Sequence, residues 1–483
     1  MSSEYHVIVI GGGSAGLVTA GGAAALGAKV ALLEGNEMGG DCLNTGCVPS
    51  KSLLASAHLA DRIRQSEERG LDGSLAPVNL EKVMNRVHRV IGEIAPHDSV
   101  ERFQSMGVEV LRTHGRLLDA HTVQAGDRVL TGKNIVIAAG SGPQIPGLEG
   151  LEKVDYLTNE TLFTLTKLPE HLMIWGAGPI AMEIGQAFVH LGSRVTVMLR
   201  GHELFKKDEP EVGDIMARKL EADGIRFRYG HDITSVSQEG NRIKLSLQEV
   251  SNHTSTHHTS THHTTSLLEG DAFLIALGRR PASAGMGLEA AGVKTDRRGF
   301  VVVNEALQTS QPHIYACGDI AGPYQFTHMA GYQAGIVVRN LFLPLKKKVD
   351  YRHVVWTTYT SPQAAHAGYT EETAKEAGLL GSVITHPFRE VDRAVIEDDR
   401  EGFLKLVLDR KKRVIGATLV CEQAGEMISL ASLAIVKKLK VSDFMNIIYA
   451  YPSKSEIFGG AALTQLKDSF KPWQKKLFQK LFL

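Results

Sequence analysis

Two cysteines, Cys42 and Cys47, are separated by four residues near the start of the 483-residue chain. A pair this close can cycle between dithiol and disulfide, because a thiolate can attack, form a mixed disulfide and close the ring again. The pair follows a glycine-rich stretch, residues 11–16, of the kind that binds dinucleotides. A flavin beside a working disulfide is the chemistry that this combination indicates, so the sequence predicts a redox enzyme.

The remaining composition limits the class of protein. Cys317 and Cys421 have no cysteine nearby, so we expect both to be packed small residues. Four cysteines are too few for a secreted disulfide scaffold and favour a reducing compartment. Lys plus Arg and Asp plus Glu each number 53, which gives no charge excess for binding nucleic acid and favours a small substrate.

The start of the chain and its apolar runs bear on location. Residues 1–6 lead directly into an apolar strand, with no basic segment or long apolar stretch before it. No run approaches the roughly 18 apolar residues of a spanning helix. We therefore expect a cytoplasmic protein. At about 150 residues per domain, its length predicts about three domains.

The first nucleotide-binding unit is predicted over residues 7–34. A strand at 7–10 leads into the glycine turn, which opens a helix, and the returning strand ends in Glu34. An acidic residue about 20 positions after the glycines can accept a hydrogen bond from a ribose hydroxyl. The candidate cofactor contacts of this unit are Gly11, Gly13, Ser14, Ala15, Gly16 and Glu34.

A second unit of the same kind starts with a strand at 172–175 and returns with a strand at 195–198. No carboxylate follows the returning strand, which instead leads to Arg200. A guanidinium binds a 2′-phosphate that a carboxylate would repel, so the sequence predicts NADPH rather than NADH. Arg200 as a solvated strand-end residue is the alternative. The candidate contacts here are Gly176, Gly178, Ile180, Arg200 and Lys206.

Three further strands are predicted to complete these two units. They cover residues 134–139, 271–277 and 313–317. The last ends in Gly-Asp, and such a carboxylate can bind a ligand hydroxyl or, equally, cap a helix. These segments and one earlier glycine supply the candidate cofactor contacts Gly115, Ser141, Gly278 and Asp319.

Beyond residue 350 the pattern becomes α+β, with strands at 402–408 and 414–420 and a helix at 425–440. Five of the 20 histidines lie in residues 253–266, which we interpret as an exposed hairpin tip, with a divalent-metal site as the alternative. Residues 471–483 form a basic amphipathic tail. We expect it to dock on the C-terminal domain, with peripheral membrane contact as the alternative.

Taken together, the Cys42-x4-Cys47-Val-Pro-Ser-Lys51 motif, the two glycine fingerprints and Ala316-Cys-Gly-Asp319 resemble one family over residues 5–465. That family is the class I pyridine nucleotide-disulfide oxidoreductases, which includes dihydrolipoamide dehydrogenase, glutathione reductase and mercuric reductase. The resemblance implies an α/β fold with two Rossmann-like dinucleotide-binding domains, for FAD and NAD(P), and a C-terminal α+β dimerisation domain. The predicted boundaries are 1–150 and 281–349 for FAD, 151–280 for NAD(P), 350–470 for dimerisation and 471–483 for the tail.

The resemblance also implies roles for individual residues. Cys42 corresponds to the exposed interchange thiol and Cys47 to the thiol beside the flavin. Lys51 and Glu183 match the pair near the reactive end of the isoalloxazine ring. A homodimer is implied, in which residues 451–456 complete the partner's active site.

The chain departs from the family in this last segment. Members that reduce disulfides have a His-Pro pair followed by Glu, whereas here Tyr451 precedes Pro452, and Glu456 is kept. A phenol of pKa about 10 is a poor base at neutral pH compared with an imidazole of about 6.5, which disfavours dihydrolipoamide oxidation. Tyr451 as a packing aromatic is the alternative. Mercuric reductase is similar at the tyrosine but carries a vicinal cysteine pair near its C-terminus, and this chain has no cysteine after Cys421.

The sequence thus predicts a FAD- and NADPH-dependent oxidoreductase that uses Cys42 and Cys47, with Lys51, Glu183, Tyr451 and Glu456 as further catalytic candidates. Its acceptor is expected to be a metal ion, a disulfide or a quinone-like molecule, and no resident metal is expected. Dihydrolipoamide dehydrogenase is one alternative. A non-enzymatic flavin redox sensor, or a membrane-docked partner protein, is the other.

Overall fold

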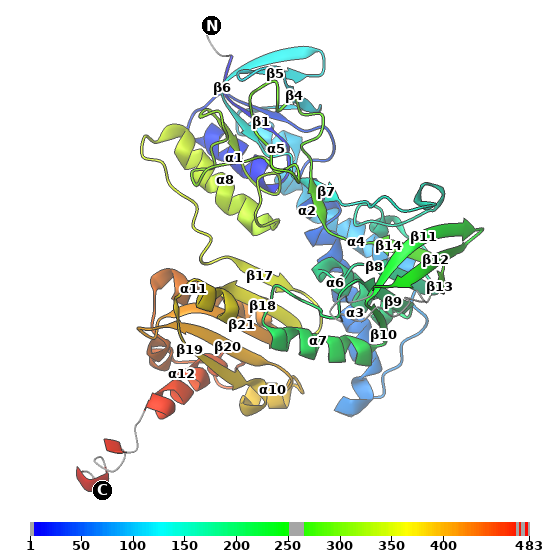
Figure 1. Cartoon of the computed structure of the whole chain (residues 1–483), viewed down its shortest axis with the longest axis vertical. Helices are drawn as coiled ribbons and strands as arrows, with labels where there is room; N and C mark the ends of the chain where they lie inside the picture. Colours follow the sequence, from blue (N-terminus) through cyan, green and yellow to red (C-terminus); the bar gives the residue numbers. More distant parts are fainter. Residues whose placement is uncertain (1–3, 251–264, 470–472, 475–478, 482–483) are drawn as a thin grey trace, which may run out of the picture. The chain divides into compact units, whose positions relative to one another are not determined.

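The computed structural model describes residues 4–250, 265–469, 473–474 and 479–481 (Figure 1). The chain divides into two compact units. The first comprises residues 1–200 and 226–349, and the second comprises residues 201–225 and 350–483. In the described part of the chain, no helix has the length and apolar character needed to cross a membrane.

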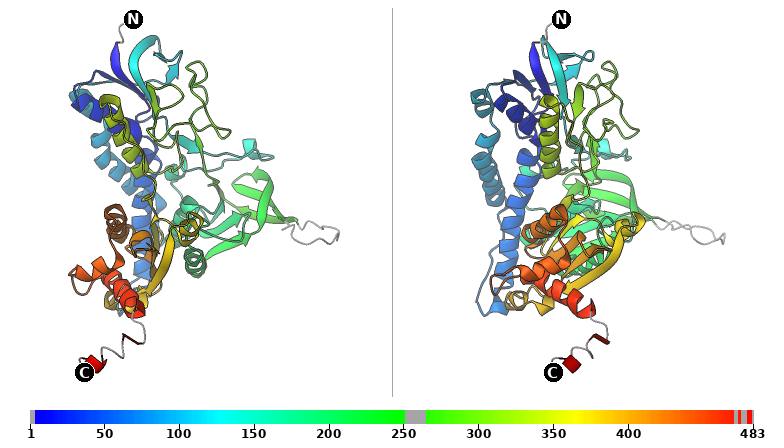
Figure 2. Two further views of the ribbon diagram at one scale, coloured as in Figure 1. Left: turned by 60° about the vertical axis from the view of Figure 1, so that its left-hand side comes forward. Right: turned by 90° about the vertical axis from the view of Figure 1, so that its left-hand side faces the viewer.

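The first unit contains a sheet whose core strands are parallel and mostly apolar. In order these strands are β3 (Val108–Leu111), β2 (Val30–Leu33), β1 (Tyr5–Ile10), β6 (Arg128–Ile137) and β16 (Ile314–Ala316). Helices α1 (Ser14–Ala25) and α8 (Thr327–Phe342) pack side by side against it (Figures 1 and 2). Strand β5 (Thr122–Ala125) extends the sheet antiparallel to β6, and β4 (Gly115–Leu117) pairs antiparallel with β5. The predicted strand–turn–helix–strand over 7–34 is therefore confirmed.

Four helices, α2 to α5, lie between β2 and β3 in the sequence. Short helix α2 (Gly40–Asn44) is followed by long helix α3 (Cys47–Arg64), which packs against α4 (Leu80–Ile94) and α6 (Pro179–Leu191). Helix α5 (Val100–Ser105) precedes β3. Because α3 begins at Cys47, the cysteine motif lies at a helix N-terminus.

The first unit contains a second, smaller sheet. Its order is β10 (Ile225–Tyr229), β9 (Arg194–Leu199), β8 (His171–Trp175) and β14 (Ala272–Ile275), in which β9, β8 and β14 are parallel. An antiparallel sheet of β11 (His231–Glu239), β12 (Arg242–Glu249) and β13 (Thr265–Gly270) follows. The antiparallel pairing of β12 with β13 agrees with the predicted hairpin. Of its predicted tip, 253–266, residues 253–264 lie outside the described residues, and residues 265–266 belong to β13. A two-stranded ribbon pairs β7 (Ser141–Pro143) with β15 (Arg279–Pro281).

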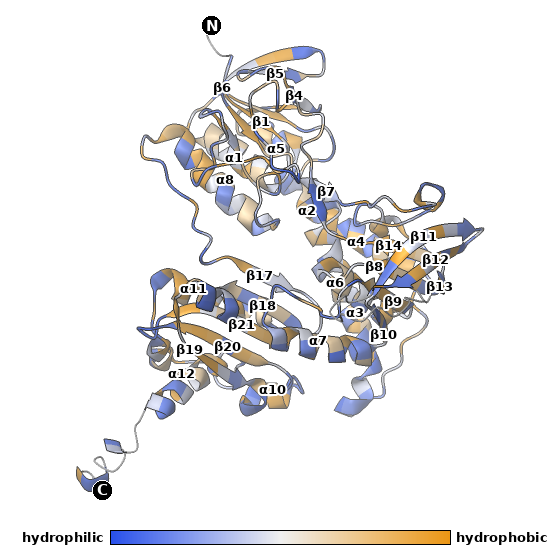
Figure 3. Cartoon of the chain, viewed as in Figure 1, coloured by the Kyte–Doolittle hydropathy of each residue, from blue (hydrophilic) through white to orange (hydrophobic). Residues whose placement is uncertain are grey.

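The second unit is built on a five-stranded antiparallel sheet. Its order is β17 (Val355–Thr358), β18 (Gln363–Gly368), β21 (Val414–Cys421), β20 (Phe403–Asp409) and β19 (Leu380–Pro387). Helices α11 (Ala424–Lys437) and α12 (Glu456–Ser469) bury the core of the unit against this sheet. Figure 3 shows β20 and β21 as mostly hydrophobic, in line with the burial of every residue of β20 and all but one residue of β21. The strands and the helix predicted beyond residue 400 are thus confirmed.

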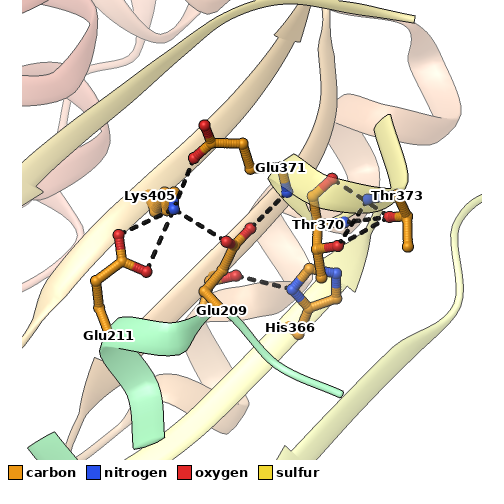
Figure 4. A network of polar contacts seen from close by, with 8 residues as sticks. Glu209, Glu211, His366, Thr370, Glu371, Thr373 and Lys405 are labelled. Carbon is orange, nitrogen blue, oxygen red and sulfur yellow. Dashed lines mark hydrogen bonds and ion pairs between the residues drawn. The ribbon is translucent and has the colours of Figure 1, made fainter. Parts of the chain in front are cut away.

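Helix α7 (Pro210–Asp223) belongs to this second unit although it precedes β10 in the sequence. Its start is held by Lys405 of β20, which is buried and lies 2.9 Å from Glu209, 3.0 Å from Glu211 and 2.9 Å from Glu371 (Figure 4). The buried Glu209 carboxylate also accepts the backbone N–H of Glu371, the first residue of α9 (Glu371–Glu376), at 2.7 Å. One lysine therefore joins a sheet and the starts of two helices.

Candidate functional site

The glycine turn between β1 and α1 contains glycines of two kinds. A Cβ on Gly11 would lie 2.3 Å from the carbonyl oxygen of Ala138, and one on Gly16 would lie 1.7 Å from the carbonyl oxygen of Gly11. These two positions must be glycine for the strand and helix to pack. Gly13 has an ordinary φ of −83°, and a Cβ there would meet only one backbone atom, at 3.8 Å. The fold does not need glycine at position 13, so its lack of a side chain points to a ligand that approaches the backbone.

The start of α1 is suited to an anionic ligand. The helix has neither a side-chain cap nor an acidic residue in its first turn, where Ser14 and Ala15 stand. The first N–H groups of a helix have no partner within it, and they attract phosphate. This turn therefore fits the pyrophosphate of a dinucleotide.

Glu34, at the end of β2, is fixed by two backbone donors. Its carboxylate accepts the N–H of Gly12 at 2.6 Å and the N–H of Asn36 at 2.6 Å. The side chain is buried beside the glycine turn. The structure thus brings together the acidic residue and the glycines, as the ribose-binding pattern requires.

Ser141 and Asp319 meet in a charged cluster that includes a residue the sequence did not single out, Arg279. The Ser141 hydroxyl donates to Asp319 at 2.6 Å, and Arg279 Nε donates to the same hydroxyl at 2.7 Å. Arg279 also lies 3.1 Å from the Asp41 carboxylate, just before Cys42. Burial raises the pKa of Asp319. Asp319 does not cap α8, because that helix starts only at Thr327.

Gly115 has a packing explanation that is independent of a cofactor. It lies in β4, where a Cβ would come within 2.9 Å of the side chains of Ile10 and Leu33. Gly278 has a φ of +121°, which requires glycine because side chains rarely adopt it. Neither observation assigns these two residues to a ligand, and their predicted contacts stay predictions.

Cys42 and Cys47 are free thiols whose side chains hydrogen-bond each other. The bond from Cys42 lowers the pKa of Cys47 to about 6, and Thr327 and the Lys51 ammonium act in the same direction. The same bond raises the pKa of Cys42. Cys47 is the first residue of α3, where the helix dipole also favours a thiolate. At neutral pH Cys47 is therefore the thiolate and Cys42 the thiol.

Thr327 is the second functional residue that the sequence did not reveal. Its hydroxyl lies 3.2 Å from the Cys47 sulfur, although the two residues are 280 positions apart. Thr327 is the first residue of α8, the helix that packs beside α1 on the sheet that contains β1. Nothing local in the sequence marks it, because only the fold brings the start of α8 to the start of α3.

Lys51 and Glu183 form an ion pair of 2.7 Å between α3 and α6. The Glu183 carboxylate is 5% exposed, and Lys51 follows Cys47 by one helical turn. The pair links the helix that carries the reactive thiolate to the helix that follows the second glycine fingerprint. Cys47, Lys51 and Glu183 thus share one side of the α3–α6 contact.

The second glycine turn repeats the logic of the first. A Cβ on Gly176 would lie 2.3 Å from the carbonyl oxygen of Ala276, whereas a Cβ on Gly178 would meet no atom within 4 Å. Pro179 opens α6, which has no side-chain cap and no acidic residue in its first turn; Ile180 follows and is 40% exposed. A second phosphate-bearing nucleotide fits here, at the end of β8.

Arg200 stands at the end of β9, as expected, but it has a partner that the sequence did not indicate. Its guanidinium lies 2.6 Å from the carboxylate of Asp232 in β11. Lys206, the other basic candidate, belongs to the second compact unit.

Tyr451 and Glu456 also lie in the second unit. The exposed Tyr451 phenol donates to Asp392 at 2.9 Å, and this bond raises the pKa of the phenol. Glu456 opens α12 and accepts the N–H of Ser453 at 3.0 Å. Between them, buried Lys454 lies 2.9 Å from Glu397 and 2.6 Å from Asp399, which fixes the segment on the fold.

Two family models match the chain. The model described as pyridine nucleotide-disulphide oxidoreductase matches residues 5–334, and the model of the dimerisation domain of the same family matches residues 354–462. In the part of the chain that the structure describes, no group of three or more His, Cys, Asp or Glu residues could hold a metal ion.

Characterised relatives are similar over nearly the whole chain. A mercuric reductase of Lysinibacillus sphaericus is 34% identical over 97% of this chain and 84% of its own length. A dihydrolipoyl dehydrogenase of Chlamydia muridarum is 30% identical over 96% of this chain and 97% of its own length. The Cu(II) complex of the HOCl-induced flavoprotein disulfide reductase RclA from Escherichia coli superposes with a TM-score of 0.82 and 27% identity, covering 96% of this chain and 100% of that chain.

Proposed function

Because the chain belongs to the pyridine nucleotide-disulphide oxidoreductase family, which depends on FAD and uses NAD(P)H, we propose that it is an NADPH-dependent reductase of a small acceptor. Its working group is the Cys42–Cys47 pair. The observation that carries the proposal is the hydrogen-bonded sulfur pair with a lowered Cys47 pKa at the start of α3. Isolated structural cysteines would have no need of this arrangement.

The residues present fit FAD. The open backbone at Gly13 and the uncapped start of α1 would hold its pyrophosphate, and Glu34 would accept a ribose hydroxyl. Ser141, Arg279 and Asp319 would bind further polar groups of the cofactor. When bound, FAD supplies two-electron transfer between the nicotinamide and the cysteine disulfide.

Three groups prepare the sulfur pair for its task. Thr327 and the α3 N-terminus stabilise the Cys47 thiolate, and Lys51, fixed by buried Glu183, adds a positive charge beside it. Cys42 keeps its proton until an acceptor arrives. The reduced pair therefore holds one negative charge and one proton at neutral pH.

The class of acceptor depends on how the Cys42 thiol can lose its proton. Reduction of an organic disulfide needs a base to activate Cys42, and Tyr451 is poorly suited because its own pKa is raised. A soft divalent metal ion lowers the pKa of a thiol that binds it, so it displaces the Cys42 proton without a base. Both sulfurs would then bind the ion and the Cys42 proton would pass to water. As the S–S bond forms, its two electrons would reduce one Hg(II) ion, or two Cu(II) ions by one electron each.

We therefore place a soft metal ion first among the acceptors. The similarity to mercuric reductases and to a flavoprotein disulfide reductase whose structure is a Cu(II) complex supports this order. A disulfide or quinone-like acceptor comes second. Dihydrolipoamide oxidation is the competing activity, supported by the dihydrolipoyl dehydrogenase relative and opposed by Tyr451.

The proposed partners and location follow from the same features. Arg200 and Lys206 favour NADPH over NADH, and the dimerisation domain supports a homodimer. Sparse cysteines support a cytoplasmic location. Peripheral membrane contact through residues 471–483 stays the alternative to docking of that tail on the C-terminal domain.

The test starts from the purified yellow protein under anaerobic conditions. NADPH should produce a long-wavelength thiolate-to-flavin absorbance band, and Hg(II), Cu(II), lipoamide, glutathione disulfide and a quinone are then compared as acceptors. Replacing Cys47 by Ser should abolish the band, and replacing either Cys42 or Cys47 should abolish turnover of a metal ion. The matched control is Cys317→Ser, a buried cysteine away from the pair. A colourless protein, or full turnover in the double Cys→Ser variant, would refute the proposal.

A further inference from the structure

The pairing of Arg200 with Asp232 carries an inference about nucleotide selectivity that rests on the proposed use of NADPH. Arg200 is 69% exposed and Asp232 25% exposed, with 2.6 Å between guanidinium and carboxylate. In the sequence they are separated by α7 and β10. The expected phosphate-binding arginine is thus already in an ion pair before any nucleotide binds.

The topology places this pair at the nucleotide-binding edge of the sheet. Arg200 directly follows β9, which runs parallel to the fingerprint strand β8. The neighbouring strand β10 ends at Tyr229, and Gly230, with a φ of +65°, turns the chain into β11, where Asp232 is the second residue. Nucleotides bind beyond the carboxyl ends of such strands. Asp232 therefore stands beside the site rather than at a remote surface.

The Asp232 carboxylate depends on Arg200. Its Oδ2 atom contacts the guanidinium, while its Oδ1 atom is buried and, among the described residues, has no hydrogen-bond partner. The ion pair with Arg200 offsets part of the cost of burying this carboxylate oxygen. Any ligand that draws Arg200 away leaves this charge poorly compensated.

We propose that Asp232 is a specificity-determining residue that restrains the preference for NADPH. A 2′-phosphate carries about two negative charges at neutral pH and must share Arg200 with the carboxylate. NADH has a neutral hydroxyl at that position, so it meets no repulsion from Asp232. The Asp232 carboxylate thereby lowers the ratio of NADPH to NADH affinity that Arg200 alone would give. NADH consequently stays a usable electron donor.

The experiment is a double-mutant cycle on the purified holoprotein. Dissociation constants of 2′,5′-ADP and 5′-AMP are measured by calorimetry for the wild type, Asp232→Asn, Arg200→Gln and the double variant. These fragments differ only in the 2′-phosphate and require no acceptor. Glu239→Gln is the matched control, because it removes a carboxylate from the same strand, where Glu239 pairs with Lys244 at 2.8 Å.

Asp232→Asn should tighten 2′,5′-ADP about tenfold and leave 5′-AMP unchanged; in the Arg200→Gln background, where only the direct repulsion between carboxylate and phosphate is left, the gain should be clearly smaller. Glu239→Gln should change neither ligand. Unchanged or weaker 2′,5′-ADP binding in Asp232→Asn would overturn the role of Asp232 alone, provided that Arg200→Gln weakens 2′,5′-ADP. If Arg200→Gln has no effect, both the role of Asp232 and the proposed NADPH site fail.

Melting temperatures show whether each variant is folded. Asp232→Ser is the second variant, because it also removes the charge but has a smaller side chain. It should tighten 2′,5′-ADP in the same way. Opposite shifts for the two variants would refute the charge mechanism.

Discussion

Cys47 combines three influences that stabilise a thiolate. It opens a helix, accepts hydrogen bonds from Cys42 and Thr327, and lies one turn from Lys51. A thiolate is the nucleophilic and metal-binding form of cysteine. The chemistry of the pair is therefore set by the surroundings of one sulfur atom.

The pH dependence of alkylation tests this assignment. Since its pKa is lowered to about 6, Cys47 in the reduced protein should react with iodoacetamide with a rate that rises through pH 6 and is nearly constant above pH 7. Cys42, whose pKa is raised, should stay unreactive over this range. Mass spectrometry of each peptide measures the two rates. Equal titration of both cysteines near pH 8.5 would contradict the asymmetry.

The Thr327 hydroxyl has a separable effect. Thr327→Val keeps the shape of the side chain but removes the donor, so the pKa of Cys47 should rise and the alkylation profile should move to higher pH. Thr327→Ser keeps the donor and serves as the control. An unchanged profile in the valine variant would exclude the hydroxyl as a stabilising group.

Residues that are close in the sequence could be predicted, and residues joined only by the fold could not. Cys42, Cys47 and Lys51 follow one another in a recognisable motif. Thr327, Arg279 and Asp232 act on predicted residues from distant segments, and no local pattern marks them. Tertiary packing determines which residues form hydrogen bonds and ion pairs with the site residues. The spacing of residues along the chain does not reveal this packing.

At the scale of elements, the two glycine turns show what local patterns determine well. Strand, turn and helix follow one another in each unit, and steric contact dictates glycine at Gly11 and Gly176. The placement of α7 is a different matter. This helix lies inside the range 151–280 predicted for the NAD(P) domain, and by compactness residues 201–225 group with residues 350–483.

Lys405 holds α7 in that group, which predicts a large stability effect. Lys405→Met would leave buried Glu209 without its cation, at a cost of about 3–5 kcal/mol, because an unpaired buried charge is strongly unfavourable. The melting temperature should fall clearly. Lys348→Met is the control, because the Lys348–Glu305 pair is exposed and worth at most about 1 kcal/mol. Equal melting temperatures for both variants would show that the buried network contributes little.

At the scale of the whole molecule, the second unit presents apolar side chains to solvent. Met445, at the end of the final 3-10 helix (Val441–Asn446), is 44% exposed, and Ile448 and Tyr451, which follow it, are 99% and 72% exposed. Contiguous exposed apolar groups of this kind mark interfaces between proteins. They lie within the range matched by the dimerisation domain.

A charge at Ile448 should therefore disrupt a homodimer. Ile448→Asp is expected to elute as a monomer in size-exclusion chromatography with light scattering, and to lose turnover if residues 451–456 complete the partner's site. Leu345→Asp, at a position 78% exposed in the first unit, should stay dimeric. A dimeric Ile448→Asp variant would place the interface elsewhere.

The family resemblance made the fold class and the order of the domains predictable, because each domain has its own motif or pattern of apolar residues. The predicted domain boundaries stay predictions. The compact units of the structure divide the chain differently from the predicted domains, because residues 201–225 group with residues 350–483. Hydrophobic periodicity identifies a helix but does not identify which sheet its apolar side will cover.

The interleaving of the chain has a practical consequence for dissecting the protein. A fragment that starts at residue 350 would contain Lys405 but not Glu209 or Glu211. The five-stranded sheet of the second unit would also lose helix α7. Truncation at either terminus therefore cannot excise this unit intact. Rescue of such a fragment would require a separate peptide spanning residues 201–225, added in trans.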